Sequence, residues 1–255
     1  MPAGPLAPCP IHRHAQARPD ALALWSPERR WTYAEIDAAI AATRVRLGEV
    51  GIPNGSRIAV RLHRGPDFVI LLWALWRAGH VAMPLSTRLP AAEARRTAQR
   101  MEAQLFVTRD STLLEMEQGD LKTDPPDRFV EREGRGAPNP SPKPIHRRAT
   151  LVFTSGSTGT PTAVLHSWAN HLYSAKGSNA NLPLRPKRSE EVVSGLRPER
   201  SAGSRCDRVL SECEEVSRKP SRMRRGDRWL LSLPLYHVGG LAILVRCALA
   251  GTAVA

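Results

Sequence analysis

The chain has 255 residues, of which 42% are hydrophobic, and it carries a formal net charge of +13. A chain of this length can bury a substantial core. The longest apolar run of the chain, at 68–76, is too short for a membrane-spanning helix, which needs about 20 residues. The arginines are scattered and form no stripe interleaved with aromatics, so a nucleic-acid partner is not indicated. The segment 185–225 alone holds 12 Lys/Arg and 7 Asp/Glu and supplies +5 of the charge.

The cysteines and the N-terminus favour a reducing compartment. Four cysteines occur, none in a C-x-x-C pair and none with histidines at zinc spacing: Cys9, Cys206, Cys213 and Cys247. We therefore predict free thiols and no metal site. Residues 1–10 contain no positively charged stretch followed by an apolar core, so no secretory signal is expected and a cytoplasmic location is predicted.

Predicted strands and helices alternate along the first hundred residues. A capping box at Thr32 and Glu35 marks the start of one helix, and the helix at 66–77 is apolar nearly all round, which indicates burial between layers. This alternation predicts an α/β fold with an open sheet and helices on both faces. In chain order we predict a helix at 11–18, a strand at 21–25, a helix from 33 to 48–51, a strand at 57–62, a helix at 66–77, a strand at 80–85, a helix at 90–101 and a strand at 104–108.

The remaining organisation is less regular. Residues 119–149 are rich in Pro, Asp, Arg and Gly and predict a surface linker. The charged segment 185–225 separates two parts, 1–184 and 226–255, and its composition predicts disorder. A surface loop, a regulatory or binding tail and sequence from a reading-frame or splicing error remain alternatives for it. In the last part we predict a strand at 229–233, a helix at 241–249 and a strand beginning at 252.

The stretch 151–161 organises the chain. An apolar strand end, 151–153, is followed by small residues whose N–H and hydroxyl groups can surround a phosphate: Thr154, Ser155, Gly156, Ser157, Thr158 and Gly159. A helix predicted at 163–182 would offer its positive N-terminus to the anion. The stretch is not a Walker A loop, because the glycines are too close and no lysine follows. A Ser/Gly linker is the alternative, which the apolar flanks disfavour. The two histidines in this predicted helix, His166 and His171, are expected to have no chemical role.

The sequence T-S-G-S-T-G-T-P-T-A-V from residue 154 resembles the T-S-G-S-T-G-x-P-K-x-V phosphate loop of the adenylate-forming superfamily. That superfamily includes acyl-CoA synthetases, luciferases and peptide-synthetase adenylation domains. Stretches 31–35, 55–60 and 74–85 are similar to its N-terminal part, and P-L-Y-H-V-G-G at 234–240 resembles its second motif. Within the superfamily, the chain looks most like the o-succinylbenzoate–CoA ligases of menaquinone biosynthesis, in 177–183 and 231–244.

The resemblance implies ATP-dependent activation of a carboxylic acid as an acyl-adenylate, followed by transfer to CoA. It implies ATP, Mg²⁺ and CoA as cofactors, a small-molecule carboxylate as partner, and no membrane. By the same resemblance, residues 154–159 contact the pyrophosphate, and His237 is the catalytic residue beside the carboxylate and α-phosphate. Gly239 and Gly240 would shape the acyl pocket.

Two departures from the superfamily pattern limit this expectation. Thr162 stands where the loop has lysine, which removes one positive charge from the phosphate site. The similarity covers 12–184 and 226–255, about half of a family member, without the Y-G-x-T-E motif, the ribose-binding Asp or the C-terminal lysine. We therefore expect that this chain alone does not complete the reaction. The alternative is a non-catalytic fragment or pseudoenzyme, including a basic interaction module.

Overall fold

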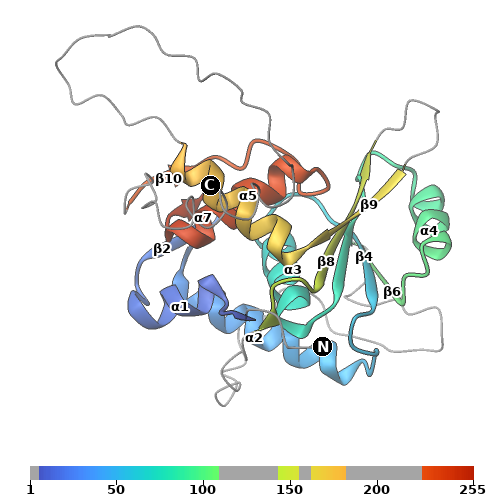
Figure 1. Ribbon diagram of the computed structural model, residues 1–255, viewed down its shortest axis with the longest axis horizontal. Helices are drawn as coiled ribbons and strands as arrows, with labels where there is room; N and C mark the ends of the chain where they lie inside the picture. Colours follow the sequence, from blue (N-terminus) through green and yellow to red (C-terminus); the bar gives the residue numbers. More distant parts are fainter. Residues whose placement is uncertain (1–5, 109–142, 155–161, 182–225) are drawn as a thin grey trace, which may run out of the picture.

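A computed structural model describes residues 6–108, 143–154, 162–181 and 226–255 (Figure 1). The predicted insert at 185–225, most of the predicted linker and the loop residues 155–161 lie outside the described residues. Within the described part, the strands form a five-stranded sheet, a four-stranded sheet and a short two-stranded pair.

The five-stranded sheet has the order β6-β4-β5-β8-β9. Its first four strands are parallel, and β9 runs antiparallel to β8 as the second arm of a hairpin. The strands are β4 (Arg57–Arg61), β5 (Val81–Pro84), β6 (Leu105–Thr108), β8 (Arg148–Thr154) and β9 (Thr162–Ser167). The predicted linker therefore ends earlier than expected, because Arg148 and Ala149 already belong to a strand.

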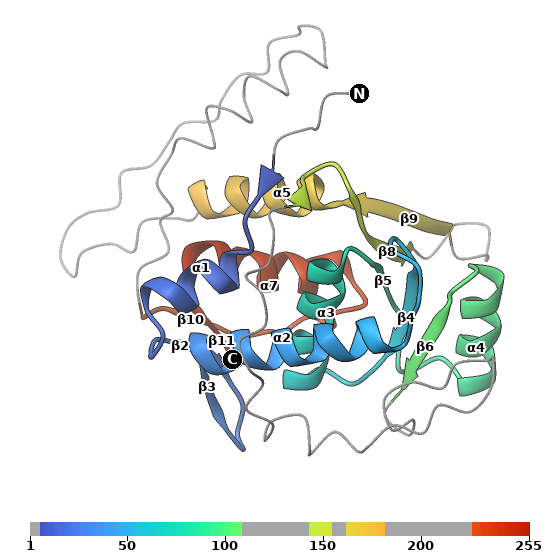
Figure 2. The ribbon, with the colours of Figure 1, turned by 90° about the horizontal axis from the view of Figure 1, so that it is seen from below.

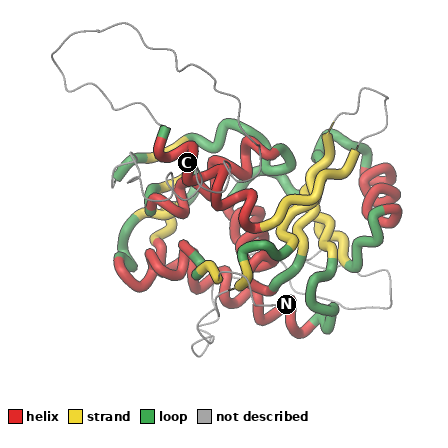
Figure 3. Tube along the Cα trace, viewed as in Figure 1, coloured by secondary structure: helices red, strands yellow, loops and turns green. Residues whose placement is uncertain are grey.

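Helices cover both faces of this sheet, as predicted (Figure 3). Helix α3 (Pro66–Ala78) links β4 to its neighbour β5, and α4 (Ala91–Arg100) then carries the chain back past β4 to β6. Right-handed crossovers running in opposite directions place their helices on opposite faces. The strand residues alternate accordingly: Ile58 joins the core that contains α3, and Ala59 joins the one that contains α4.

The four-stranded sheet joins segments from both ends of the sequence. Its order is β10 (Arg228–Trp229), β11 (Ala253–Val254), β2 (Leu22–Trp25) and β3 (Arg30–Thr32), with only the last pair antiparallel. Strand β3 was not predicted. The prediction of a strand over 229–233 is largely wrong, because only Trp229 of that range lies in β10, and Leu230 is 67% exposed. The short pair consists of β1 (Leu6–Ala7) and β7 (Lys143–Pro144).

The helix starts follow local sequence signals. Helix α2 (Tyr33–Glu49) begins with the predicted capping box: the Glu35 N–H donates to Thr32 Oγ1 at 3.2 Å, and the Thr32 N–H donates to Glu35 Oε2 at 2.7 Å. Helix α3 lies between layers with most of its side chains buried, and it ends at Gly79, whose φ of 93° favours glycine. The predictions of the capping box and of the buried helix are both confirmed.

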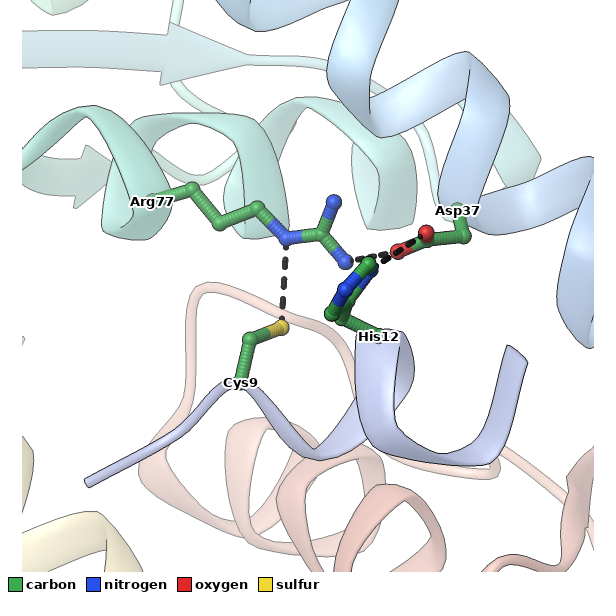
Figure 4. Close-up of polar contacts among 4 residues, drawn as sticks. All are labelled: Cys9, His12, Asp37 and Arg77. Atoms are coloured by element: carbon green, nitrogen blue, oxygen red, sulfur yellow. Dashed lines mark hydrogen bonds and ion pairs between the residues drawn. The ribbon is translucent and has the colours of Figure 1, made fainter. Parts of the chain in front are cut away.

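Helix α1 (Pro10–Ala17) is fastened on two sides. Toward α2 and α3, the Asp37 carboxylate pairs with Arg77 and accepts from His12 Nδ1 at 2.8 Å, while Arg77 Nε donates to Cys9 Sγ at 3.1 Å (Figure 4). Toward α7 (Val238–Ala250), Arg18 Nη2 donates to the Gly251 carbonyl at 3.0 Å. Figure 2 shows α1 beside one end of α7 while the other end of α7 faces the five-stranded sheet.

The helix predicted at 163–182 is present, but its predicted start is wrong. Residues 162–167 form β9, whose backbone pairs with β8, and helix α5 (Trp168–Ala180) starts only at Trp168. His166 consequently lies on a strand, and the neighbouring Leu165 is 45% exposed. The true helix start has its own capping box between Ser167 and Asn170. Among the described helices, none combines the length and apolar character that crossing a bilayer requires.

Candidate active site

Thr154 lies at the carboxyl edge of the five-stranded sheet. Because β4, β5, β6 and β8 are parallel, their carboxyl ends meet at this edge, where open α/β sheets bind ligands. Thr154 is the exposed last residue of β8, paired across the hairpin with Thr162, and its Oγ1 donates to the Thr162 carbonyl at 3.3 Å. The other predicted phosphate contacts, Ser155 to Gly159, lie outside the described residues, directly beyond this point.

The second predicted motif forms a tight turn that starts α7. The His237 N–H donates to the Pro234 carbonyl at 3.1 Å, and His237 is the N-cap residue of the helix. A Cβ on Gly240 would lie 2.3 Å from the Pro234 carbonyl oxygen, so only glycine fits there. A Cβ on Gly239 would meet Leu233 Cδ1 at 2.6 Å, which a side-chain movement could relieve. The turn therefore requires glycine at position 240, whereas the hydrogen bond at His237 uses only its backbone N–H.

The start of α7 has the electrostatics of an anion site. No side chain caps this helix, and its first turn contains no acidic residue. The positive end of the helix dipole and the first N–H groups remain available to a negatively charged group. His237 is exposed at this end, with its ring 4.7 Å from that of the half-buried Tyr236. The helix end that could serve an anion here is thus that of α7, because β9 replaces the helix start predicted after the phosphate loop.

The structure brings the second motif to the sheet edge that carries the first. Arg64, in the turn after β4, donates from Nη1 to the Leu231 carbonyl at 2.5 Å. This contact places the segment leading to His237 at the carboxyl end of β4. Thr154 ends a strand and His237 begins a helix, and within the described residues the two share no hydrogen bond.

Arg246 is a candidate that the sequence reasoning missed. Its guanidinium carbon lies 4.2 Å from the centre of the Trp229 ring, and its Nε and Nη2 atoms are buried without hydrogen-bond partners. Nearby, Asn179 Nδ2 donates to the Arg246 carbonyl at 3.2 Å, and the Asn179 Oδ1 atom is also buried and unpartnered. Unpaired buried donors are costly, so they indicate a place for a ligand acceptor. The sequence signal that could have identified Arg246 is its position as the single arginine within the apolar run 241–250.

A buried polar cluster supports β8 below the hairpin tip. The Thr150 hydroxyl, fully buried, accepts from Trp76 Nε1 at 3.2 Å and lies 2.9 Å from His171 Nε2. Burial, and to a lesser degree the neighbouring His166, lowers the pKa of His171 from 6.5 to about 4. A neutral His171 can accept from the Thr150 hydroxyl. These hydrogen bonds link β8 to α3 and α5.

The described residues contain no protein-only metal site. No group of three or more His, Cys, Asp or Glu side chains gathers in the described part of the chain. Cys9 and Cys247 are free thiols there, and burial raises the pKa of Cys247 to about 11.

Comparison with known proteins gives the family. The sequence model of the family described as "AMP-binding enzyme" matches residues 11–198, most of the chain. The chain belongs to the AMP-binding enzyme family. The matched range contains the loop at 154–164, so the resemblance of the sequence to the adenylate-forming enzymes is confirmed at the level of the family.

Two curated relatives with the same described activity illustrate the similarity. The 2-succinylbenzoate–CoA ligase of Bacillus licheniformis is 26% identical over 246 residues, which cover 96% of this chain and 43% of that protein. The ligase of the same description from Enterococcus faecalis is 22% identical over 244 residues, covering 96% and 42%. The chain thus spans less than half the length of these curated relatives.

Solved structures confirm the fold. The o-succinylbenzoate coenzyme A synthetase of Bacillus subtilis in complex with AMP matches with a TM-score of 0.70 and 23% identity, over 98% of this chain and 55% of that one. The same enzyme in complex with ATP and magnesium ion matches with a TM-score of 0.71 and 22% identity, over 98% and 44%. At these identities the likeness establishes the architecture.

Proposed function

We propose that this chain provides the phosphate-binding and carboxylate-binding parts of an ATP-dependent acid–CoA ligase, with o-succinylbenzoate as the acid. The observation that carries the proposal is the position of Thr154, at the tip of a hairpin on the carboxyl edge of the sheet, with the His237 turn held at the same edge. The family, and relatives described as 2-succinylbenzoate–CoA ligases, support this choice of reaction and acid.

The reaction has two steps. A carboxylate oxygen attacks the α-phosphorus of ATP, which forms the acyl-adenylate and releases pyrophosphate; the CoA thiol then attacks the acyl carbon and releases AMP. The donors of Thr154 to Gly159 would stabilise the charge on the departing pyrophosphate, to which Mg²⁺ would also contribute when bound. His237 and the uncapped start of α7 would face the carboxylate and α-phosphate, and Gly239 and Gly240 would leave room for the acyl group.

Arg246 fits the second carboxylate of the proposed substrate. o-Succinylbenzoate is a dicarboxylate, and only one of its carboxylates is activated. The unpaired Nε and Nη2 donors of Arg246 match the geometry of a carboxylate, and the indole of Trp229 supports the guanidinium plane. A monocarboxylic acid would leave these donors without a partner, so Arg246 favours a dicarboxylate.

The proposal is tested by pyrophosphate–ATP exchange together with calorimetric titration of ATP. Acid-dependent exchange, with o-succinylbenzoate preferred over benzoate, is expected if the chain performs adenylation. ATP binding without exchange would agree with the expectation that this chain alone does not complete the reaction. Absence of both would overturn the proposal. The variant Thr162→Lys should tighten ATP binding, because it restores a positive charge beside the loop.

Thr162 also favours a second candidate, a non-catalytic relative. In the described structure its carbonyl accepts from Thr154, and its side chain brings no charge to the hairpin. A salt-sensitive gel shift with RNA or DNA, combined with absence of ATP binding, would support a basic interaction module. ATP binding without a gel shift would instead favour a nucleotide-binding protein.

A further inference from the structure

The two motifs of the candidate site lie on different sheets. Thr154 ends β8 of the five-stranded sheet, and His237 follows β10 of the four-stranded sheet. Among the described strands, no backbone pairing joins the two sheets. Their relative position at the site therefore depends on contacts made by helices and side chains.

One side-chain contact bridges this gap at the site itself. Arg64 follows β4 directly and donates to the carbonyl of Leu231, which is 167 residues away in the sequence. On its other side, the Leu231 N–H donates to the Ala255 carbonyl at 2.7 Å, beside β11. The Leu231 backbone is thus held from both sheets at once, and its side chain is 4% exposed.

The path from Leu231 to His237 is stiff. Pro234 restricts the backbone, the His237 N–H donates to the Pro234 carbonyl at 3.1 Å, and Gly240 packs directly against the same carbonyl. A displacement at Leu231 would consequently be passed on to His237. An arginine suits this task, because its planar guanidinium points its donors in fixed directions.

We infer that Arg64 is a positioning residue, which fixes the His237 turn relative to the carboxyl edge of the five-stranded sheet. It acts through the Leu231 carbonyl and touches no reacting atom. One part of the inference rests on the proposed function, namely its effect on ligand binding. If His237 lies beside the acyl-adenylate, loss of the Arg64 contact weakens binding of that intermediate. The displacement of the turn is independent of any ligand.

The first test is made on the ligand-free full chain. Arg64→Gln should shift or broaden the imidazole NMR signals of His237, while those of His171, under β8, stay unchanged. Arg88→Gln is the matched control, because it removes an exposed positive charge from the loop after β5 at the same edge. Unchanged His237 signals in Arg64→Gln, or equal changes in Arg88→Gln, would overturn the inference whether or not the chain binds a substrate.

The second test is a double-mutant cycle with a non-hydrolysable acyl-sulfamoyl-adenosine carrying the o-succinylbenzoyl group. Loss of one charged hydrogen bond that acts through His237 should weaken binding about tenfold in Arg64→Gln, with partial rescue in Arg64→Lys. In a His237→Ala background, the Arg64 change should cost nothing further, and affinity for ATP alone should stay within about twofold. Additive losses, or equal losses for ATP and the mimic, would overturn the positioning role. A wild-type chain that binds neither molecule would refute the proposed function, and the NMR result would still decide the inference.

Discussion

Two arginines of this protein meet different surroundings. Arg77 on α3 has a side chain only 4% exposed, and its guanidinium is paired with Asp37 and with the Cys9 thiol, as Figure 4 shows. Arg246 on α7 lies against Trp229 with two buried donors unpaired. The starts of α2 and α7 differ in the same way, since α2 has a complete capping box and α7 has no side-chain cap. Among the described residues, the hydrogen bonds of Arg77 and of the α2 start are complete, whereas Arg246 and the α7 start keep donors that a ligand could use.

The largest effect is expected at the paired arginine. Asp37→Ala removes the carboxylate shared by Arg77 and His12 and leaves a buried guanidinium without a counterion. The free energy of unfolding should fall by about 3–5 kcal/mol, measured by urea denaturation. The control is Glu102→Ala, which breaks an exposed pair with Arg57 and should cost less than about 1 kcal/mol. Similar losses in both variants would contradict the distinction between the two kinds of pair.

The next effect concerns a buried group that is held neutral. The pKa of His171 is lowered to about 4 in the folded state, against 6.5 for an unperturbed histidine. Below pH 6.5 the unfolded chain takes up a proton that the folded chain excludes, so stability is complete above that pH and falls toward pH 4. The total loss should be about 3 kcal/mol, from urea denaturation at a series of pH values. His171→Gln should flatten this part of the profile; an unchanged slope would show that another group is responsible.

A smaller effect separates the two helix starts. Thr32→Ala removes the side-chain acceptor at the start of α2 and should reduce the free energy of unfolding by about 1 kcal/mol. His237→Ala at the start of α7 removes no cap and should leave stability nearly unchanged. Thermal denaturation of the two variants side by side measures the difference. Equal destabilisation of the two variants would mean that the His237 side chain also caps its helix, and would contradict the difference between the two helix starts.

The smallest effect on stability is expected at Arg246. Arg246→Met keeps an unbranched side chain against Trp229 and removes the unpaired donors, so the free energy of unfolding should change by less than about 1 kcal/mol. Binding of o-succinylbenzoate should weaken at least about tenfold, while that of benzoate should not change, as titration calorimetry would show. A large loss of stability with unaltered binding would place Arg246 with Arg77 as a structural arginine.

Much of the candidate site could be predicted because its signals are local. The turn Pro234–Gly240 combines a proline, a helix start and a glycine that packs against the carbonyl of that proline. The small residues after Thr154 predict a loop for the same reason, and this prediction lies outside the described residues. Residues 162–167 misled the prediction, because Val164 and Leu165 at helical spacing from Trp168 suit an amphipathic helix. Their pairing with β8 decides otherwise, and that partner is visible only once the hairpin is folded.

The sequence by itself determined the capping box of α2, the apolar character of α3 and the alternation of strands and helices. Each of these depends on residues within a few positions of one another. Only the tertiary structure decided that β2 and β11 from opposite ends share a sheet, that Arg64 reaches Leu231, and that Arg77 is paired while Arg246 is not. The physical reason is that hydrogen-bond satisfaction and burial depend on partners brought together by folding, and sequence spacing does not encode these partners.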